Sequence, residues 1–411
     1  MVSASATIPV GYKQTEVGII PEDWEVKRLG DLLSVMHGKS QKDVVDDSGS
    51  YPILGTGGVM GWTNQYLHDK PCVLIGRKGS IDKPQYMDTP FWSVDTLFYC
   101  IIKNNNCAKF LYYKFLEIDW YAYNEASGVP SLNAGTIEKI SIVVPNHNEQ
   151  EIIAKVLTDS DSLIQALETL IVKKRDIKQG TMQELLTGKT RLPGFSGEWE
   201  LKTLFELAEN KKSLFDDGDW IEAEHISESG VRLIQTGNIG IGCFLDKNSK
   251  KYISNESFER LKCKEIFPGD LLVCRLAEPS GRACVLPEIS ENKIITSVDV
   301  TIYRPPKNLA SRVFLQYIFS TSNWLDLVSN NSGGTTHKRI SRSVLGKLKI
   351  KIPEINEQEA IAEILSDMDA EIVALEQRLE KAKAIKQGMM QQLLTGRIRL
   401  VEPSTSKEAS A

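Results

Sequence analysis

The sequence predicts an α+β protein in which two globular domains are joined by two long helices that form an antiparallel coiled coil, a pseudo-two-fold tandem repeat. The first observation is an ungapped internal repeat, because residues 148–192 and 356–400 agree at more than half of roughly 45 positions. The second is a motif, W-E-(V/L)-K-x-L-x-(D/E)-L, that starts at Trp24 and again at Trp199. The third is that each motif precedes a long segment with the turn residues and apolar runs of short strands. Each repeat unit is therefore a motif, a variable domain and a helix.

These features place the boundaries of the domains. We expect an N-terminal arm at 1–23, a first globular domain at 24–145, a first helical spacer at 146–192, a second globular domain at 193–352, a second helical spacer at 353–400 and a disordered tail at 401–411. Residues 1–15 are expected to be loose. Strands are predicted at 51–58, 72–80, 140–144, 233–239, 269–275, 294–303 and 348–352, and shorter helices at 110–120 and 313–328.

Both repeated segments are predicted to be long helices. Asn148 and Asn356 are each followed three residues later by a glutamate, Glu151 and Glu359, which is the pattern of a capping box. Apolar residues then recur at spacings of three and four, so that one seam faces a partner helix. The seam is predicted to contain Ile153, Leu157, Ile164, Leu167, Ile171, Ile177, Leu185, Ile361, Leu365, Met368, Ile372, Leu375, Leu379, Ala382, Ile385, Met389 and Leu393.

The length of these helices indicates that they pair with each other. A helix of about 40 residues is about 60 Å long, which is too long to bury its apolar stripe within a small domain. Parallel pairing would require identical polar interruptions to face each other, whereas antiparallel pairing creates a pseudo-two-fold axis. We therefore favour antiparallel pairing, and the alternative that each helix packs only on its own globular domain stays open.

Composition and charge limit the functional classes. The chain has 411 residues, is 41% hydrophobic, and has no apolar run long enough for a membrane span or a secretory signal, so we expect a cytoplasmic protein with no membrane partner. Seven cysteines without a C-x-x-C pair and five scattered histidines indicate neither disulfides nor a metal site. The net charge is -5, but the second globular segment contains more basic than acidic residues.

No catalytic motif is complete. Residues 188–190 resemble the end of a phosphate-binding loop, but Gln183 stands where that loop needs a glycine, and the second copy reads Gly-Arg-Ile at 396–398. Residues 304–307 contain the only Pro-Pro pair, without the flanks of a methyltransferase catalytic loop, and no acidic nuclease constellation can be placed on neighbouring strands. We therefore expect no catalytic residue, no metal and no cofactor on this chain.

Polar and basic side chains next to glycines instead indicate DNA recognition. Such loops let the backbone approach a phosphate, while Arg and Lys reach base edges in the major groove. For any single residue, a solvated loop position is the competing interpretation. The candidate DNA-contacting residues are Arg77, Lys78, Ser80, Lys83, Arg275, Arg282, Thr335, Thr336, His337, Lys338, Arg339 and Arg342.

The whole pattern resembles a known family. With two W-E-x-K motifs, two variable segments, and two helices that open P-x-x-N-E-Q-E and close Q-x-L-L-T-G, the sequence resembles the specificity subunit of a type I restriction-modification system. Phrases such as I-Q-T-G-N-I at 234–239, G-D-L-L at 269–272 and I-G-R-K-G at 75–79 are typical of the target-recognition domains of that family.

The resemblance implies that each variable domain reads one half of a bipartite, asymmetric double-stranded DNA site, and that the coiled coil sets the spacer between the halves. It also implies two modification subunits, which bind S-adenosylmethionine and methylate adenine N6, and two restriction subunits, with ATP and Mg bound by these partners. The alternatives are a stand-alone sequence-specific DNA-binding adaptor of another defence system, a self-contained methyltransferase or nucleotide-dependent enzyme, and a coiled-coil scaffold without DNA.

Overall fold

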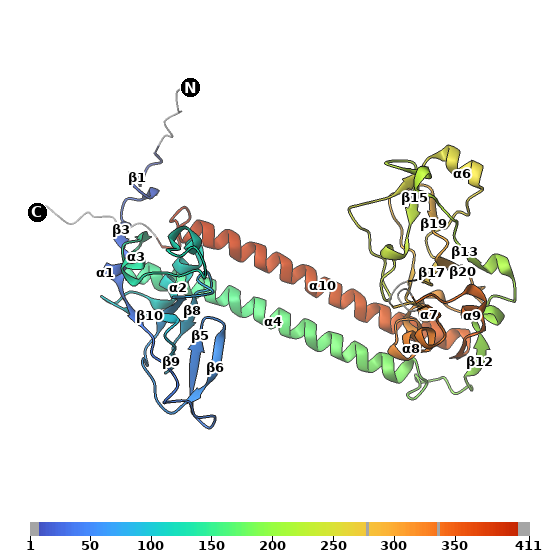
Figure 1. Cartoon of the computed structure of the whole chain (residues 1–411), viewed down its shortest axis with the longest axis horizontal. Coiled ribbons are helices and arrows are strands. Elements are labelled where there is room, and N and C mark those ends of the chain that lie inside the picture. The colour runs from blue at the N-terminus through green and yellow to red at the C-terminus, as the bar shows by residue number, and fades with distance from the viewer. Residues whose placement is uncertain (1–7, 277–278, 335–337, 402–411) are drawn as a thin grey trace, which may run out of the picture. The chain divides into compact units, whose positions relative to one another are not determined.

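The chain folds into two compact units that share their helices. The computed structural model describes residues 8–276, 279–334 and 338–401. The first unit contains Met1–Thr169 and Glu376–Ala411, and the second contains Leu170–Leu375. Helices α4 (His147–Leu185) and α10 (Ile355–Leu393) each begin in one unit and end in the other (Figure 1). Each unit therefore contains one part of α4 and one part of α10, which come from the two copies of the repeat.

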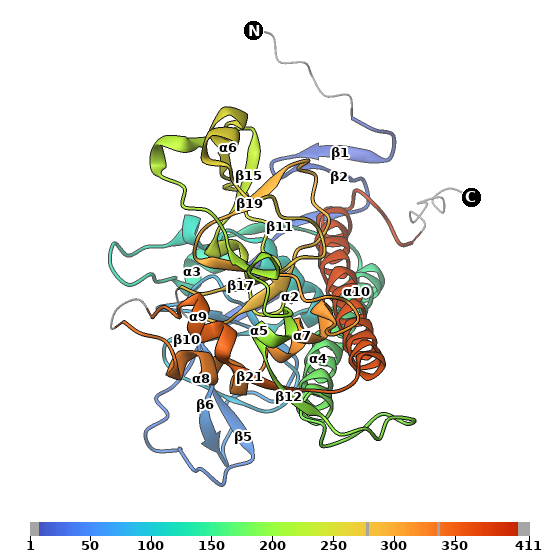
Figure 2. The same cartoon turned by 90° about the vertical axis from the view of Figure 1, so that its right-hand side faces the viewer.

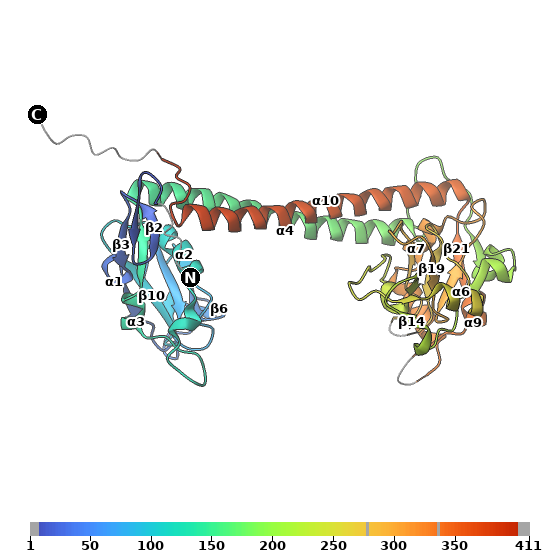
Figure 3. The ribbon, with the colours of Figure 1, turned by 90° about the horizontal axis from the view of Figure 1, so that it is seen from above.

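Helices α4 and α10 run antiparallel in both units, as predicted. They lie side by side in Figures 1 and 3, and ion pairs join them. The pairs are Asp161–Lys386 (2.5 Å) and Glu168–Lys383 (3.0 Å) in the first unit, and Lys174–Glu371 (2.7 Å) and Lys178–Asp369 (2.5 Å) in the second. Residue numbers rise along one helix as they fall along the other, which defines the antiparallel direction.

The predicted seam lies between these helices. Nine of its residues are buried, namely Ile153, Leu157, Leu167, Ile171, Leu185, Ile361, Leu365, Ile372 and Leu393. Ile164, Met368, Leu375, Leu379, Ala382 and Met389 are half-buried. The prediction is wrong for Ile177 and Ile385, which are 44% and 52% exposed. In the first unit Leu157 belongs to one core with Leu393 and Leu394, and in the second Leu365 belongs to one core with Leu185 and Leu186.

The predicted capping boxes are wrong in register. Helix α4 begins at His147, and the residue that caps it is Asn146, whose Oδ1 accepts a hydrogen bond from the Glu149 N–H at 3.0 Å. Helix α10 begins at Ile355. Asn148 and Asn356 therefore lie inside the first turns of the helices. The next residues, Glu149 and Glu357, make the contacts described below.

The N-terminal segment is not loose where the structure describes it. Strands β1 (Tyr12–Thr15) and β2 (Gly18–Pro21) form an antiparallel hairpin. Ile20 is buried in the core of the first unit, and the Tyr12 hydroxyl donates to the carbonyl of Gly396 at 3.0 Å. The physical reason is that this segment covers the end of α10, which the local sequence does not reveal.

A short two-stranded sheet joins each domain to its helices. In the first unit β3 (Glu25–Arg28) pairs antiparallel with β11 (Ser141–Val144), and in the second β12 (Glu200–Thr203) pairs antiparallel with β21 (Lys349–Ile352). The chain thus enters and leaves each domain on neighbouring strands. A single turn of helix follows each entering strand, α1 (Leu29–Leu32) in the first domain and α5 (Leu204–Leu207) in the second.

The first domain contains two sheets. An antiparallel sheet has the order β4-β10-β7-β8, and a three-stranded sheet has the order β6-β5-β9, in which β5 and β9 are parallel. The strands are β4 (Leu33–His37), β5 (Tyr51–Gly55), β6 (Gly58–Thr63), β7 (Cys72–Gly76), β8 (Gln85–Met87), β9 (Trp92–Ser93) and β10 (Leu97–Ile102). The helices are α2 (Ala108–Glu117) and α3 (Ala134–Glu138), with a 3-10 turn at Trp120–Tyr123.

The second domain repeats this topology. Its antiparallel sheet has the order β13-β20-β17-β18, and its other sheet has the order β14-β16-β15-β19, in which β15 and β19 are parallel. Figure 2 shows α6 beside β15 and β19, where Phe258 joins their core. The strands are β13 (Phe215–Asp217), β14 (Ile226–Ser227), β15 (Val231–Ile234), β16 (Tyr252–Ile253), β17 (Leu271–Cys274), β18 (Ala283–Val285), β19 (Ile294–Thr296) and β20 (Val300–Tyr303).

The second domain contains more helices than predicted. They are α6 (Asn255–Leu261), α7 (Arg312–Ile318), α8 (Ser322–Asn330) and α9 (Arg342–Lys347), with 3-10 turns at Lys212–Leu214, Ala223–His225 and Thr236–Asn238. The helix predicted at 313–328 is two helices, because the hydroxyl of Thr321 caps a new helix by accepting from the Trp324 N–H at 3.3 Å. Likewise the strand predicted at 294–303 is two strands that turn at 297–299.

Candidate nucleic-acid interface

The loop after β7 presents the basic tip that was predicted in the first domain. A Cβ at Gly76 would lie 2.0 Å from the carbonyl oxygen of Ser80, so only glycine permits this close turn. Gly79 has a backbone φ of +97°, which residues other than glycine rarely adopt. The tight turn leaves Arg77 and Lys78 exposed at its tip.

Hydrogen bonds hold the backbone of this tip on two sides. The Arg77 N–H donates to the Thr96 carbonyl at 2.8 Å, and the Arg77 carbonyl accepts from the Leu132 N–H at 2.9 Å. The Gly79 N–H donates to the Pro130 carbonyl at 2.9 Å. Of the four predicted residues, Arg77, Lys78 and Lys83 are exposed and Ser80 is half-buried. The tip is therefore a fixed loop with exposed cationic side chains, and Nη1 of Arg77 donates to the Asp95 carbonyl at 3.1 Å.

The corresponding loop of the second domain uses its arginine differently. The Arg275 N–H donates to the Asp299 carbonyl at 2.8 Å, and the Arg275 carbonyl accepts from the Ile340 N–H at 3.0 Å, which repeats the two bonds of Arg77. Its side chain is only 3% exposed and donates to the carbonyls of Ile340 (3.2 Å) and Val298 (2.5 Å). Burial lowers the pKa of Arg275, and Asp217, 3.1 Å from its Nε, opposes that effect.

Arg282 is also internal. Its Nε donates to the carbonyl of Ile239 at 2.7 Å, its Nη1 to Pro279 at 2.9 Å and its Nη2 to Thr236 at 2.9 Å. The planar guanidinium group has several N–H donors, so one arginine can satisfy several carbonyls of neighbouring loops. Arg275 and Arg282, predicted as DNA contacts, thus fix the loops of the second domain from inside.

Three more of the predicted residues, Lys338, Arg339 and Arg342, lie at or just before the start of α9. Arg339 is exposed and its Nη2 lies 2.7 Å from Asp299, while the half-buried Arg342 pairs with Asp216. The Nζ of Lys338 donates to the Ser329 hydroxyl at 3.1 Å. Three further predicted residues, Thr335, Thr336 and His337, lie outside the described residues.

A polar cavity of about 390 Å³ lies beside these loops in the second domain. None of the predicted DNA-contacting residues that the structure describes lines this cavity, although the segment 234–239 was noted as typical of target-recognition domains. The lysine-rich loop at 247–251, which follows a glycine-rich turn, is the signal that could have found its lining residues. The lining residues are Asp219, Trp220, Ile221, Leu233, Gln235, Thr236, Gly237, Asn238, Lys247, Ser249, Lys251, Ser297, Val298 and Asp299.

The first turn of each long helix is bound to the segment that follows the other helix. Glu149 is fully buried and accepts from Nε (2.5 Å) and Nη2 (2.7 Å) of Arg399 and from Nε1 of Trp24 (3.1 Å). In the second unit Glu357 accepts from Nε (2.6 Å) and Nη2 (2.7 Å) of Arg191. These bidentate pairs close both ends of the helical repeat in the same way.

The comparisons with known proteins agree with this architecture. The family model for the "Type I restriction modification DNA specificity domain" matches residues 21–174 and 197–386, once in each half of the chain. The chain belongs to this family of type I restriction-modification specificity proteins. The family model thus repeats along the chain as the motif, domain and helix do.

Individual relatives match the chain over nearly its whole length. The type I restriction enzyme MjaVIII specificity subunit of Methanocaldococcus jannaschii is 25% identical, over 93% of this chain and 94% of the relative. The putative type I restriction enzyme MjaX specificity subunit of the same organism is 26% identical, over 95% and 97%. The crystal structure of the type I restriction-modification S subunit from M. genitalium has the same fold, with a TM-score of 0.60 and 15% identity over 90% of this chain and 96% of that one.

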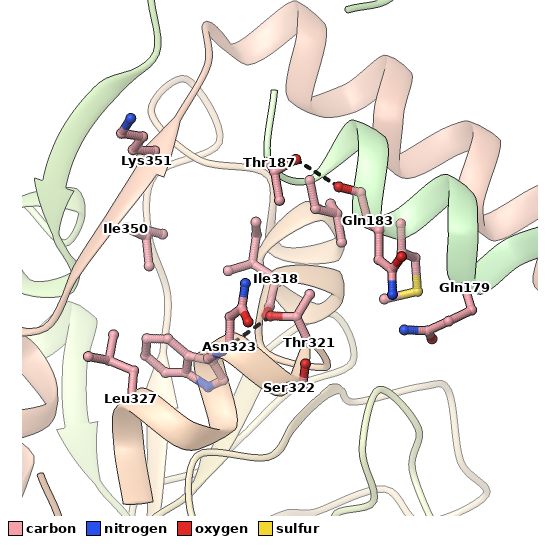
Figure 4. A pocket seen from close by; sticks show the side chains of 13 residues that line it. Gln179, Gln183, Thr187, Ile318, Thr321, Ser322, Asn323, Leu327, Ile350 and Lys351 are labelled. Atoms are coloured by element: carbon pink, nitrogen blue, oxygen red, sulfur yellow. Dashed lines mark hydrogen bonds between the residues drawn. The ribbon is translucent and has the colours of Figure 1, made fainter. Parts of the chain in front are cut away.

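A second cavity, of about 550 Å³, lies in the second unit of this specificity-family protein, where the end of α4 meets α8 and β21 (Figure 4). Met182, Leu186 and Trp324 form part of its wall, and among the described lining residues only Lys351 is titratable. In the first unit the end of α10 is contacted by Lys114, which is buried and whose Nζ donates to the Leu394 carbonyl at 3.2 Å. The described lining of the cavity offers no acid-base pair.

The cysteines of this specificity-family protein are mostly buried and have no disulfide partner among the described residues. Burial raises the pKa of the Cys72 thiol and of the Cys284 thiol to about 12, which keeps both protonated at neutral pH. Within 8–276, 279–334 and 338–401, no group of three or more His, Cys, Asp and Glu side chains is placed to hold a metal ion. In the same residues, no helix combines the length and the apolar character of a membrane span.

Proposed function

We propose that this chain is the DNA-specificity subunit of a type I restriction-modification enzyme, that it has no catalytic residue, and that each domain reads one half of a bipartite, asymmetric site. The observation that carries the proposal is that two domains of one topology have different surfaces at the same loop. Arg77 projects into solvent, whereas Arg275, held by the same backbone bonds, is buried. Two domains with the same backbone topology but different surfaces are suited to recognise two different DNA sequences.

We propose further that the paired helices set the spacer between the two half-sites. Each helix contains 39 residues, and each begins in one unit and ends in the other. At ~1.5 Å per residue such a helix is about 58 Å long, and half-sites on one side of B-DNA recur about every 34 Å, one helical turn. A helix of this length is therefore longer than one turn of B-DNA.

The docking of two modification subunits is supported by a duplicated surface. We define the Ile-Gly patch as Ile177 with Gly180 in α4, and Ile385 with Gly388 in α10. The isoleucines are 44% and 52% exposed, and nothing lies within 4 Å of a Cβ built on either glycine. A glycine inside a helix costs about 1 kcal/mol relative to alanine, and packing within the described residues does not require it here.

Residues i and i+3 share one helix face, so each patch offers an apolar side chain beside bare backbone. Because the patch occurs once in each repeat copy, it fits two copies of one partner. We propose that these partners are the modification subunits, which carry S-adenosylmethionine and transfer methyl groups to adenine N6. Two restriction subunits, which use ATP and Mg, complete the proposed enzyme.

The proposal is tested by co-expressing the chain with a modification subunit and mapping N6-methyladenine across the genome of the host. The expected result is a motif of two unlike half-sites separated by a fixed spacer. The chain alone should bind the same DNA weakly, since its partners are expected to supply most phosphate contacts. A contiguous motif, or tight specific binding by the chain alone at physiological salt, would instead support a stand-alone DNA-binding adaptor.

A further inference from the structure

The polar cavity of the second domain is formed by the loops that leave two parallel strands. β15 and β19 pair in parallel, with Ile234 opposite Thr296, so both end at the same edge of their sheet. The loop 235–239 follows β15 and the turn 297–299 follows β19, and both line the cavity. Their junction is closed by the Ser297 N–H, which donates to the Ile234 carbonyl at 3.0 Å.

The floor of this cavity is held rigid. Oδ1 of Asn238 accepts from the Gln235 N–H at 3.0 Å, and Nδ2 of Asn238 donates to the Leu245 carbonyl at 3.0 Å. The buried Arg282 holds the carbonyls on both sides of Asn238, as described above. A binding surface that is already ordered loses little conformational entropy when its ligand arrives.

The charges around the cavity favour an anionic ligand. Its two carboxylates already have cationic partners, since Asp219 lies 3.8 Å from the Nζ of Lys264, and Asp299 lies 2.7 Å from Nη2 of Arg339. Lys247 and Lys251 are exposed, and across the described residues neither ammonium group has a hydrogen-bond or ion-pair partner. The mouth of the cavity thus carries two uncompensated positive charges.

The glycine beneath Lys247 has a direct role in this arrangement. A Cβ at Gly237 would lie 2.9 Å from the Nζ of Lys247, so a side chain at 237 would displace the ammonium group from the cavity. Trp220 lies at the rim and is 69% exposed, where an indole can pack against sugar or base. The cavity therefore combines fixed backbone, free cations and an exposed aromatic ring.

We propose that this cavity is the base-reading surface of the second domain, in which Gln235 and Lys247 contact purine edges in the major groove and Lys251 contacts a neighbouring phosphate. The inference rests on the proposed function. Gln pairs best with the N6 and N7 of adenine, and Lys with the O6 and N7 of guanine. The first domain has no such loop, because β5 and β6 are joined by a tight turn between Gly55 and Gly58.

The experiment uses the full chain co-expressed with its modification subunit, with N6-methyladenine mapped for each variant. Gln235→Ala and Lys247→Ala should each relax one or two positions of a single half-site, with a loss of preference of about 5-fold to 150-fold, while the other half-site stays unchanged. Lys251→Ala should weaken DNA binding at all sequences and reduce the salt dependence by about one phosphate contact. Lys347→Ala removes an exposed lysine of the same domain outside the cavity and should change nothing.

Two further results keep the test decisive. Gln235→Glu and Lys247→Gln retain similar volume and should change the base preferred at the same positions, even if an alanine variant folds poorly. An unchanged motif in folded Gln235 and Lys247 variants would overturn this inference alone. Absence of a bipartite motif with the wild-type chain would overturn the proposed function, and this inference with it.

Discussion

Arg399 and Glu149 lie 250 positions apart in the chain, yet they form a bidentate ion pair with N–O distances of 2.5 and 2.7 Å. Arg399 also donates to both carboxylate oxygens of Asp23, at 2.8 and 2.9 Å. The pair connects the segment after α10 to the first turn of α4. Arg191 and Glu357 repeat the connection in the second unit.

Substitution of either arginine should destabilise its own unit. Arg399→Ala leaves Glu149 as a buried carboxylate without its cation, which should cost about 3 to 5 kcal/mol, and Arg191→Ala should act similarly through Glu357. Urea unfolding and hydrogen exchange around the first turns of α4 and α10 measure the effect. Lys155→Ala, which breaks the exposed pair with Asp159, should cost no more than about 0.5 kcal/mol. Equal losses in all three variants would refute a special role for the buried pairs.

Glycine replacement should separate helix stability from assembly. Gly180→Ala and Gly388→Ala should each stabilise the helices by up to about 1 kcal/mol, because the backbone is helical and no atom obstructs the new methyl group. The same variants should weaken binding of the modification subunit, measured by co-purification or calorimetry. Ser162→Ala in α4 serves as a control outside the Ile-Gly patch. Unchanged assembly in both glycine variants would argue against docking at this patch.

The spacer should follow the length of the helices. Deletion of residues 165–171 together with 376–382 removes the Glu168–Lys383 pair, leaves Asp161 with Lys386 and Lys174 with Glu371 to pair, and spares the Ile-Gly patch. Seven residues correspond to about 10 Å of helix, so the methylated motif should lose about three base pairs of spacer. Its two half-sites should keep their sequences. A deletion in only one helix should disrupt pairing, and an unchanged spacer in the double deletion would reject the role of the helices in spacing.

Two topologically equivalent arginines should behave oppositely. Arg77→Ala should leave stability within about 0.5 kcal/mol and reduce recognition of one half-site, because its side chain is exposed. Arg275→Ala should destabilise the second unit by about 3 kcal/mol, because it removes the ion pair with Asp217 and leaves two buried carbonyls without their donor. Thermal unfolding and methylation mapping of the same two proteins give both readouts. A stable Arg275→Ala protein with an altered motif would contradict this assignment.

Acid should weaken the first unit through His68. Its ring contacts Phe91 and Tyr99, and its Nε2 has no hydrogen-bond partner within the described residues. Burial lowers the pKa of His68, an effect that Asp69 opposes. His68 therefore binds a proton more readily in the unfolded chain than in the folded chain. The free energy of unfolding should be highest above about pH 6.5 and should fall as the pH decreases towards the folded-state pKa. His68→Phe should remove this part of the pH dependence in urea melts; a parallel loss in both proteins would exclude His68.

The helices and their direction could be predicted because they depend on repeated residue spacing. An apolar seam over many turns requires a partner helix, and the internal repeat identified it. The helix start was less predictable, because Asn146 and Asn148 are both good caps and only the structure distinguishes them. The hairpin β1–β2 escaped prediction because its partners lie at the other end of the chain.

The common topology of the two domains could not be inferred from residue identity. The shared features are backbone hydrogen bonds, such as those of Arg77 with Thr96 and of Arg275 with Asp299, which place no constraint on the side chain. For the same reason, the sequence did not distinguish an exposed arginine from a buried one. The polar cavity combines loops around Trp220, Lys247 and Ser297, which are far apart in the chain.

The neighbouring strands at the neck of each domain have an evolutionary consequence. Arg28 pairs with Ser141, and Thr203 pairs with Lys349, so the two chain ends of either domain are adjacent when it is removed from the scaffold. A whole domain can therefore be exchanged as a cassette between related genes without altering the helices. If the proposed function holds, such an exchange would replace one half of the methylated site and leave the partner-docking surfaces of the helices in place.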